Sequence, residues 1–145
     1  MTAHTMVLGA DRTVDSGNNA TRYFPQNPIE FGIYSRVTFQ MYCSAVTGSP
    51  SDWSMTYKFQ WAMEHTTGAQ FAAAPSWKDF SAADIATFVV GGADWTPITT
   101  ADANPRIQQR TLLRPPSLVR VIATPSYTGG SSPSNTVTGL AICEF

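Results

Sequence analysis

Two stretches of alternating residues, separated by turn formers, restrict the fold of this chain more than any other feature. Apolar side chains take every second position in 37–45 and in 55–63, and residues 47–52 read Thr-Gly-Ser-Pro-Ser-Asp. Successive side chains of a strand point to opposite faces of a sheet, so each stretch has one core face and one polar face. The pattern predicts a β-hairpin in which 37–45 pairs antiparallel with 54–63. The predicted core residues of this hairpin are Phe39, Met41, Phe59 and Trp61.

Further strand and turn signals follow along the chain. Residues 118–124 have apolar side chains on both faces, which predicts a strand in the middle of its sheet. Residues 135–145 alternate again, and the Gly, Ser and Pro residues of 125–134 predict the turn of a second hairpin. Shorter strands are predicted at 76–80, 95–100 and 107–112, with turns at 66–70 and 101–105.

The helical content predicted by the sequence is small. Ser81-Ala82-Ala83-Asp84 has the form of a capping box, which predicts a single helical turn over 81–86. About eight short strands with turn signals between them predict an all-β fold, an antiparallel β-sandwich or jelly-roll-like domain.

The first thirty residues differ from the rest. Residues 11–21 are polar, and the prolines at 25 and 28 are incompatible with a central strand or a helix. The sequence therefore predicts an extended N-terminal arm with a short edge strand over 1–30, and a single β-sandwich domain over 31–145. Such an arm lies either on its own domain or on a neighbouring protein.

Composition points to a surface that is partly covered by other proteins. Charged residues make up 13% of the chain, about half of the ~25% typical of globular proteins. The formal net charge of -1 and the pI near 6.0 offer no attraction for nucleic acid or an anionic membrane. Neither an export signal nor a membrane-spanning segment is expected. Cys43 and Cys143 are expected to be buried free thiols, with a disulfide between them as the alternative.

Residues that could carry chemistry are sparse. The only histidines are His4, near the N-terminus, and His65, at a strand end, which is expected to be an exposed turn residue rather than the base of a hydrolase triad. No Cys or His pair has metal-ligand spacing, and no phosphate-binding glycine loop is present. The expectation is a protein that is not an enzyme and uses no metal or cofactor.

Two sets of residues could support binding. Trp53, Trp77 and Trp95 lie in or beside predicted loops, where they could stack on sugars or fill the core. The arginines at 106, 110 and 114 recur every four residues, which gives either a basic stripe on one strand face or a plain solvated face. Aromatic and Arg residues are enriched at interface centres. The predicted partner contacts lie in the arm and in 94–114, and are Tyr23, Phe24, Trp95, Arg106, Arg110 and Arg114.

The order of strands and turns resembles a known group of viral proteins. The segments Met-Thr-Tyr-Lys-Phe-Gln at 55–60, Ser-Trp-Lys-Asp-Phe at 76–80 and Leu-Val-Arg-Val-Ile-Ala-Thr at 118–124 carry the resemblance. They are similar to small β-sandwich virion proteins of tailed bacteriophages, including capsid decoration (cement) proteins. The resemblance covers roughly 33–80 and 112–145, and related sandwiches also occur in phage tails and baseplates.

This resemblance implies a structural role. Proteins of this group, often trimers, bind the major capsid protein on the outer capsid surface and brace the shell against internal DNA pressure. The expected location is the virion, after assembly in the cytoplasm of the bacterial host. The alternative is a carbohydrate-binding β-sandwich module associated with the tail or baseplate.

Overall fold

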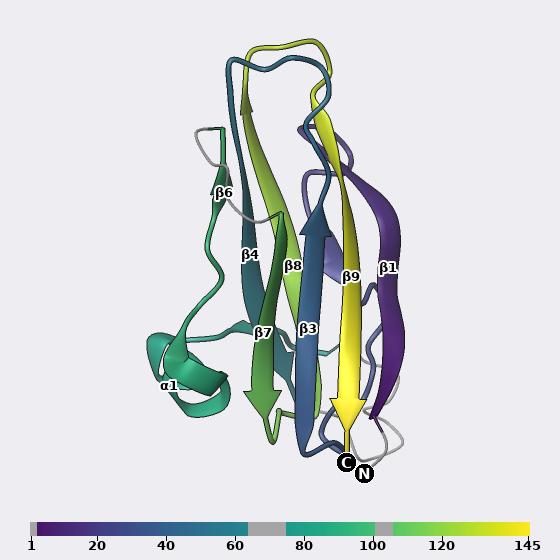
Figure 1. Ribbon diagram of the computed structural model, residues 1–145, viewed down its shortest axis with the longest axis vertical. Helices are drawn as coiled ribbons and strands as arrows, with labels where there is room; N and C mark the ends of the chain where they lie inside the picture. Colours follow the sequence, from purple (N-terminus) through teal and green to yellow (C-terminus); the bar gives the residue numbers. More distant parts are fainter. Residues whose placement is uncertain (1–2, 64–74, 101–105) are drawn as a thin grey trace.

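The computed structural model describes residues 3–63, 75–100 and 106–145, and the predicted turns at 66–70 and 101–105 lie outside them (Figure 1). The described residues form nine strands, one short α-helix and one 3-10 turn. In chain order these are β1 (Ala3–Asp15), β2 (Arg22–Phe24), β3 (Arg36–Cys43), β4 (Asp52–Ala62), β5 (Lys78–Asp79), α1 (Ala82–Phe88), η1 (Val90–Gly92), β6 (Ile98–Thr99), β7 (Ile107–Leu113), β8 (Leu118–Thr128) and β9 (Ser134–Glu144).

The strands form two antiparallel sheets that face each other. The four-stranded sheet has the order β1-β9-β3-β7, and the five-stranded sheet has the order β2-β8-β4-β5, with β6 also paired to β4. Figure 1 shows the four-stranded sheet in front of β4 and β8. The predicted all-β antiparallel sandwich is therefore confirmed. The structure also confirms that β8 is an inner strand, because it pairs with β2 on one side and with β4 on the other.

The predicted pairing of 37–45 with 54–63 is wrong. β3 pairs with β7 and β9, whereas β4 pairs with β8, β5 and β6, so the chain crosses from one sheet to the other between them. We call such a connection between strands of different sheets an arch. The second predicted hairpin is also an arch, because β8 and β9 belong to different sheets. An arch and a hairpin each need two strands with one apolar face and a turn between them. Alternation alone does not distinguish them.

The turns of the two arches lie against each other. Thr47 forms an isolated bridge with Ser134, and the Ser131 N–H donates to the Gly48 carbonyl at 2.8 Å. Gly48 has a φ of +82°, and a Cβ added there would meet the Ser131 carbonyl oxygen at 2.5 Å. The turn therefore needs glycine both for its conformation and for the close approach of the second turn.

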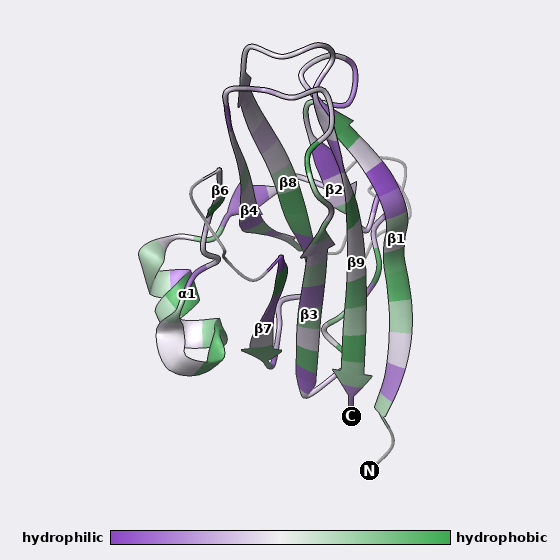
Figure 2. Ribbon diagram, turned by 45° about the horizontal axis from the view of Figure 1, so that its top comes forward, coloured by the Kyte–Doolittle hydropathy of each residue, from purple (hydrophilic) through white to green (hydrophobic). Residues whose placement is uncertain are grey.

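The inward faces of β3 and β4 form the centre of the core. Hydrophilic and hydrophobic residues alternate along β3 (Figure 2), and Phe39, Met41 and Phe59 are fully buried as predicted. Trp61 is an exception, because its side chain is only partly buried while the next residue, Ala62, is buried. Alternation breaks at this end of β4, where the Lys78 ammonium lies 5.6 Å from the centre of the Trp61 ring.

The described residues of 1–30 lie on their own domain, which is one of the two alternatives for the predicted arm, and their edge strand is longer than the short one predicted. Residues 3–15 form a 13-residue strand that pairs with β9 from Ala3 to Asp15. Its Leu8 and Val14 side chains are buried, as is Phe24 of β2. Register irregularities between Val7 and Gly9 and between Gly9 and Arg12 break the alternation of the strand. Such β-bulges hide a strand from a pattern search and are common at sheet edges.

Local capping decides where α1 begins. The Ser81 hydroxyl accepts a hydrogen bond from the Asp84 N–H at 3.2 Å, and the Asp84 carboxylate accepts one from the Ser81 N–H at 2.9 Å. The predicted capping box is thus confirmed. The helix runs to Phe88, beyond the single turn predicted over 81–86, and buries Ile85.

Candidate interaction surfaces

The predicted contacts in the N-terminal segment point in opposite directions. Phe24 is fully buried, and its ring lies so close to Gly9 and Gly139 that a Cβ on either glycine would meet it at 2.9 Å. Phe24 therefore belongs to the core and cannot touch a partner of the folded chain. Tyr23, the preceding residue of β2, is only partly buried, and its ring lies against Arg120.

Trp95 also belongs to the core. Its side chain is 6% exposed and packs against Phe59 and Tyr57, with ring centroids 5.2 and 5.5 Å apart. The Arg110 guanidinium covers the ring at 5.4 Å and donates two hydrogen bonds to the Asp94 carbonyl, at 2.8 and 3.0 Å. These contacts hold 94–96 against β7 and leave no indole face for a partner.

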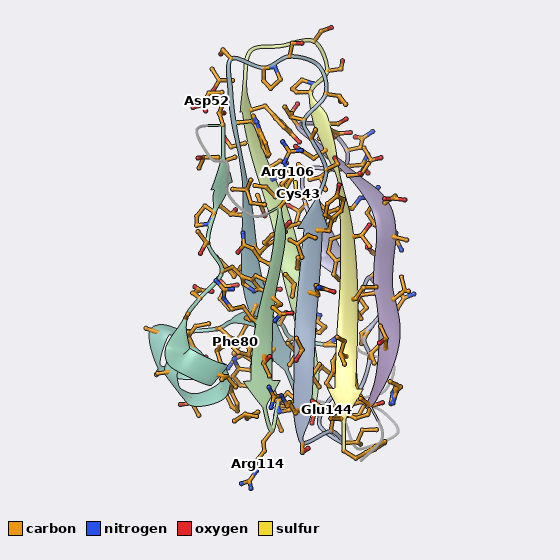
Figure 3. All side chains as sticks on the ribbon, viewed as in Figure 1. Cys43, Asp52, Phe80, Arg106, Arg114 and Glu144 are labelled. Atoms are coloured by element: carbon orange, nitrogen blue, oxygen red, sulfur yellow. The ribbon has the colours of Figure 1, made fainter. Side chains whose placement is uncertain are left out.

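The three arginines of 106–114 do not form a basic stripe. Arg110 shares the inward side of β7 with Gln108 and Leu112, which are both buried. Arg106 and Arg114 are exposed at opposite ends of this strand (Figure 3). Both lie just outside β7, where the strand alternation does not apply, so their four-residue spacing does not put them on the same face as Arg110. Arg114 has a φ of +48°, and its N–H donates to the Ser35 carbonyl at 2.8 Å.

The tryptophans offer little to a sugar ligand. Trp53, like Trp95, is buried, at 7% exposed. Trp77 is partly buried beneath the Arg120 guanidinium, which lies 4.1 Å from its ring centre. Of the three tryptophans that could have stacked on sugars, two therefore fill the core and the third holds a cation.

The outer surface of the four-stranded sheet carries almost no charge. One row of side chains across β1, β9, β3 and β7 consists of Thr5, Ile142, Thr38 and Thr111, and the next of Val7, Leu140, Gln40 and Gln109. A third row adds Thr138, Tyr42 and Ile107. We call these eleven residues the uncharged face. Its largest exposed apolar side chains are Val7 (64% exposed), Ile107 (55%) and Tyr42 (43%).

Charged groups border the uncharged face at its two ends. At one end the Arg36 Nε lies 3.4 Å from the Glu144 carboxylate. At the other, the Thr138 hydroxyl donates to the Asp11 carboxylate at 3.4 Å. Between them, Gln40, Tyr42, Ile107, Thr138 and Leu140 line a shallow hollow with mostly apolar walls. The face is therefore a continuous surface whose eleven side chains another protein can cover without burying a charge among them.

A different arrangement lies on the outer surface of the five-stranded sheet. The Arg120 guanidinium sits over the ring of Tyr23 at 4.0 Å as well as over Trp77, and its Nε donates to the Gln60 side-chain oxygen at 2.9 Å. Gln60 in turn donates to the Asp79 carboxylate at 2.7 Å, which also binds Lys58 at 3.2 Å. Burial lowers the pKa of Arg120 from its ordinary value. We call Tyr23, Gln60, Trp77 and Arg120 the arginine cluster.

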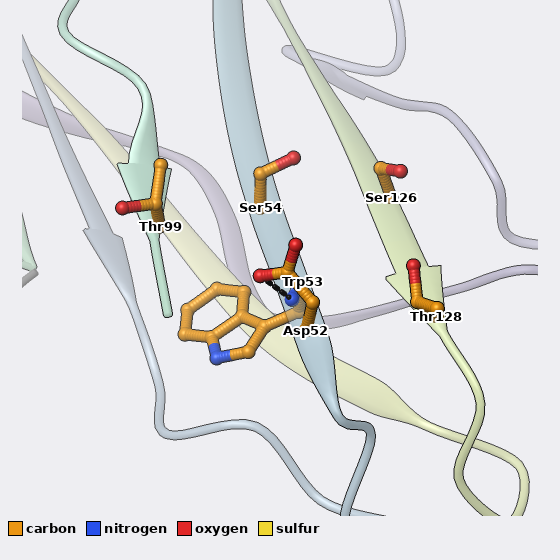
Figure 4. Close-up of a pocket in the computed structure, with 6 residues that line it drawn as sticks. All are labelled: Asp52, Trp53, Ser54, Thr99, Ser126 and Thr128. Atoms are coloured by element: carbon orange, nitrogen blue, oxygen red, sulfur yellow. Dashed lines mark hydrogen bonds between the residues drawn. The ribbon is translucent and has the colours of Figure 1, made fainter. Parts of the chain in front are cut away.

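A small polar pocket opens near the far end of the same sheet (Figure 4). It is lined by Asp52, Trp53, Ser54, Thr99, Ser126 and Thr128. One oxygen of the Asp52 carboxylate already accepts hydrogen bonds from the Thr100 hydroxyl at 2.6 Å and from the Trp53 N–H at 2.9 Å. The pocket lining holds hydroxyl groups and one carboxylate but no histidine, lysine or arginine. Acid–base catalysis there would have no base besides this occupied carboxylate.

The described histidine and the two cysteines are either hydrogen-bonded within the chain or buried. The His4 ring nitrogen Nε2 lies 2.9 Å from the Tyr34 hydroxyl, and His65 falls outside the described residues. Cys43 and Cys143 are free and buried, and burial raises the pKa of each thiol to about 11. β-strand register separates the two, because Cys43 stands opposite Val137 and Cys143 opposite Val37.

Within 3–63, 75–100 and 106–145, no three His, Cys, Asp or Glu side chains gather as a metal site would require. No described helix combines the length and apolar character needed to span a membrane.

The uncharged face and the arginine cluster were not predicted from the sequence. The outward residues of β3, β7 and β9 can be found by alternation, but their union into one face requires the strand order. Arg120 is visible as the one charge in a largely apolar strand, whereas Tyr23 and Trp77 reach it only through pairing of distant segments. Comparison of the chain with protein-family models, curated proteins and solved structures finds no match.

Proposed function

We propose that this chain is a structural virion protein of the decoration (cement) type. It binds the outer surface of a phage capsid through the uncharged face and stabilises the shell. The observation that carries the proposal is this face, an exposed sheet surface of eleven residues that presents Val7, Tyr42 and Ile107 without a charged residue among them. Depletion of charge and enrichment of aromatic residues characterise the centre of protein interfaces.

The edges of the four-stranded sheet favour contact through a face rather than through strand addition. Val89 forms a bridge with Leu112 beside β7, and the Gln108 side chain exchanges two hydrogen bonds with the backbone of Thr96. At the opposite edge, β1 is bulged, and the Arg22 Nε donates to the Thr13 carbonyl at 2.9 Å. Bulges and covering segments are the devices that protect sheet edges from pairing with other chains.

Repetition on a lattice makes modest contacts sufficient. The proposed partner is the major capsid protein, and the proposed functional unit is a homo-oligomer, with a trimer implied by the resemblance to decoration proteins. When several copies of a face act together, the second and later contacts form at a high effective concentration. A face with few charges and no deep pocket can therefore give stable occupancy of a shell.

The proposal is tested by direct binding to shells. Purified chain is mixed with capsids of the encoding virus that lack it, and bound chain is measured after sedimentation. We expect saturable binding at defined lattice positions, a higher temperature of shell disruption, and no quenching of tryptophan fluorescence by glycans. Saturable quenching by a glycan, without binding to shells, would instead support the carbohydrate-binding alternative at a tail or baseplate.

A further inference from the structure

We propose that the arginine cluster is a second binding site, at which Arg120 receives a carboxylate group from an acidic side chain of a partner protein. The site lies on the five-stranded sheet and does not include the uncharged face. The inference goes beyond capsid binding and does not depend on it, since it concerns the chemistry of one side chain and its surroundings.

The first argument is that the guanidinium is held in place before any partner arrives. Its carbon lies 4.0 Å from the Tyr23 ring centre and 4.1 Å from that of Trp77. A further bond from its Nε to Gln60 fixes the rotation of the planar group. Binding normally costs the conformational entropy of ordering a long side chain. Here the Arg120 side chain is already ordered in the folded chain, so this cost is smaller.

The second argument is that hydrogen-bonding capacity remains. A guanidinium has five N–H donors, and the Nε donor of Arg120 is the one engaged by Gln60. Among residues 3–63, 75–100 and 106–145, no acceptor bonds the four donors on the two terminal nitrogens of Arg120, although the side chain is partly buried. A donor with reduced access to water gains more from an added acceptor than a fully solvated one.

The third argument is the local balance of charge. Asp79 is the nearest acidic group in the hydrogen-bonded chain that starts at Arg120, and its carboxylate is bound by Lys58 and Gln60. The Asp79 carboxylate is therefore bonded to Lys58 and Gln60 and reaches Arg120 only through the Gln60 side chain. A partly desolvated cation without a direct bond to this carboxylate attracts an anion.

The shape of the donor group suits a carboxylate. Two parallel N–H groups of a guanidinium match the two oxygens of a carboxylate, and the pair is stronger and more directional than a lysine contact. The aromatic rings cover the planar surface of the guanidinium, so an acceptor reaches it at its edge, where the N–H groups point. Tyr, Trp and Arg are also the residue types that dominate binding energy in protein interfaces.

The test uses the folded chain labelled with ¹⁵N in its arginine side chains. Sodium acetate, and in a parallel series sodium phosphate, replaces sodium chloride at constant ionic strength while guanidinium resonances are followed by NMR. Arg114, which is exposed at the end of β7, serves as a reference in the same spectra. We expect a saturable shift of the Arg120 resonances with acetate, and a small, linear shift for Arg114.

Two variants complete the experiment. Arg120→Lys keeps the charge but removes the planar fork, and Trp77→Leu removes one flanking ring; each should weaken acetate binding at least several-fold. If a variant does not fold, the wild-type titration still tests whether Arg120 binds acetate. The Arg120 resonances are then assigned by through-bond correlation instead of by comparison with the variant. The proposal is overturned if acetate shifts Arg120 no more than Arg114, or if phosphate binds Arg120 more tightly than acetate.

Discussion

The rings of Phe39 and Phe59 meet edge to face across the sandwich, with centroids 5.4 Å apart and ring planes inclined by 75°. Their strands belong to different sheets, and Phe59 also contacts Trp95 and Phe80. The contact joins the two sheets and the 75–96 segment at one point. The two outer surfaces, with the uncharged face on one side and the arginine cluster on the other, depend on this shared core.

Removal of the Phe59 ring should therefore be costly. We expect Phe59→Ala to lower the free energy of unfolding by about 3–5 kcal/mol, because a large buried ring leaves a cavity that its neighbours fill only in part. Urea denaturation followed by circular dichroism measures the change. Thr56→Ala on the exposed side of β4 is the control. Equal losses for both variants would contradict the assignment of Phe59 to the centre of the core.

Deletion of the N-terminal strand should unfold the chain. Removing residues 1–15 takes away β1, exposes the edge of β9 and uncovers the core where Leu8 and Val14 lie. We expect the truncated protein to lose its cooperative thermal transition. Val7→Thr, a change on the exposed side of the same strand, should leave the melting temperature nearly unchanged. A truncated protein that melts like the full chain would favour the alternative in which the arm lies on a neighbouring protein.

The contact between the two arch turns can be tested with a pair of glycines. Gly48 and Gly91 have nearly equal φ values, +82° and +80°, but a Cβ on Gly48 would meet backbone of the other turn, whereas one on Gly91 would meet nothing within 4 Å. Both alanine variants carry backbone strain on the order of 1–3 kcal/mol. We expect Gly48→Ala to lose clearly more stability than Gly91→Ala. Equal losses of stability in the two variants would mean that the two turns are not in close contact.

The buried thiols should make stability fall in alkaline solution. Burial raises the pKa of Cys43 and Cys143 from 9.0 to about 11, so between these values the unfolded chain releases protons that the folded chain retains. The contribution of these thiols to the free energy of unfolding is therefore fully present below pH 9 and is lost as the pH rises toward 11. We expect this decline to be shallower in the double variant Cys43→Ala, Cys143→Ala. Parallel curves for the variant and the wild type would show that the thiols titrate normally in the folded chain.

The sequence was sufficient for features that depend on local order. Alternation located β3, β4, β8 and β9, and the Ser81 capping box located the start of α1, because each signal lies within a few residues. Pairing could not be found in this way, since an arch and a hairpin share one local pattern. The edge strand in 1–30 was predicted too short because bulges next to Gly9 interrupt the alternation of β1.

The candidate sites required the fold. Trp95 and Phe24 have the residue types of an interface, but burial assigns both to the core. Arg120 gains its role from Tyr23 and Trp77, which only the pairing of β2 with β8 and the path of 75–80 bring near. Residue type alone therefore indicated candidates, and position in the sandwich separated core residues from surface residues.

The central claim, that the uncharged face binds the shell, is tested most directly by the occupancy of purified capsids by the variant Ile107→Asp. Ile107 is 55% exposed and lies within the proposed contact, on β7 at one corner of the uncharged face, and Thr124→Asp places the same charge on the exposed side of β8 in the opposite sheet. We expect Ile107→Asp to lower occupancy at least tenfold, while its melting temperature and the occupancy of Thr124→Asp stay close to those of the wild type. Wild-type occupancy by Ile107→Asp, or an equal loss for Thr124→Asp, would contradict the claim.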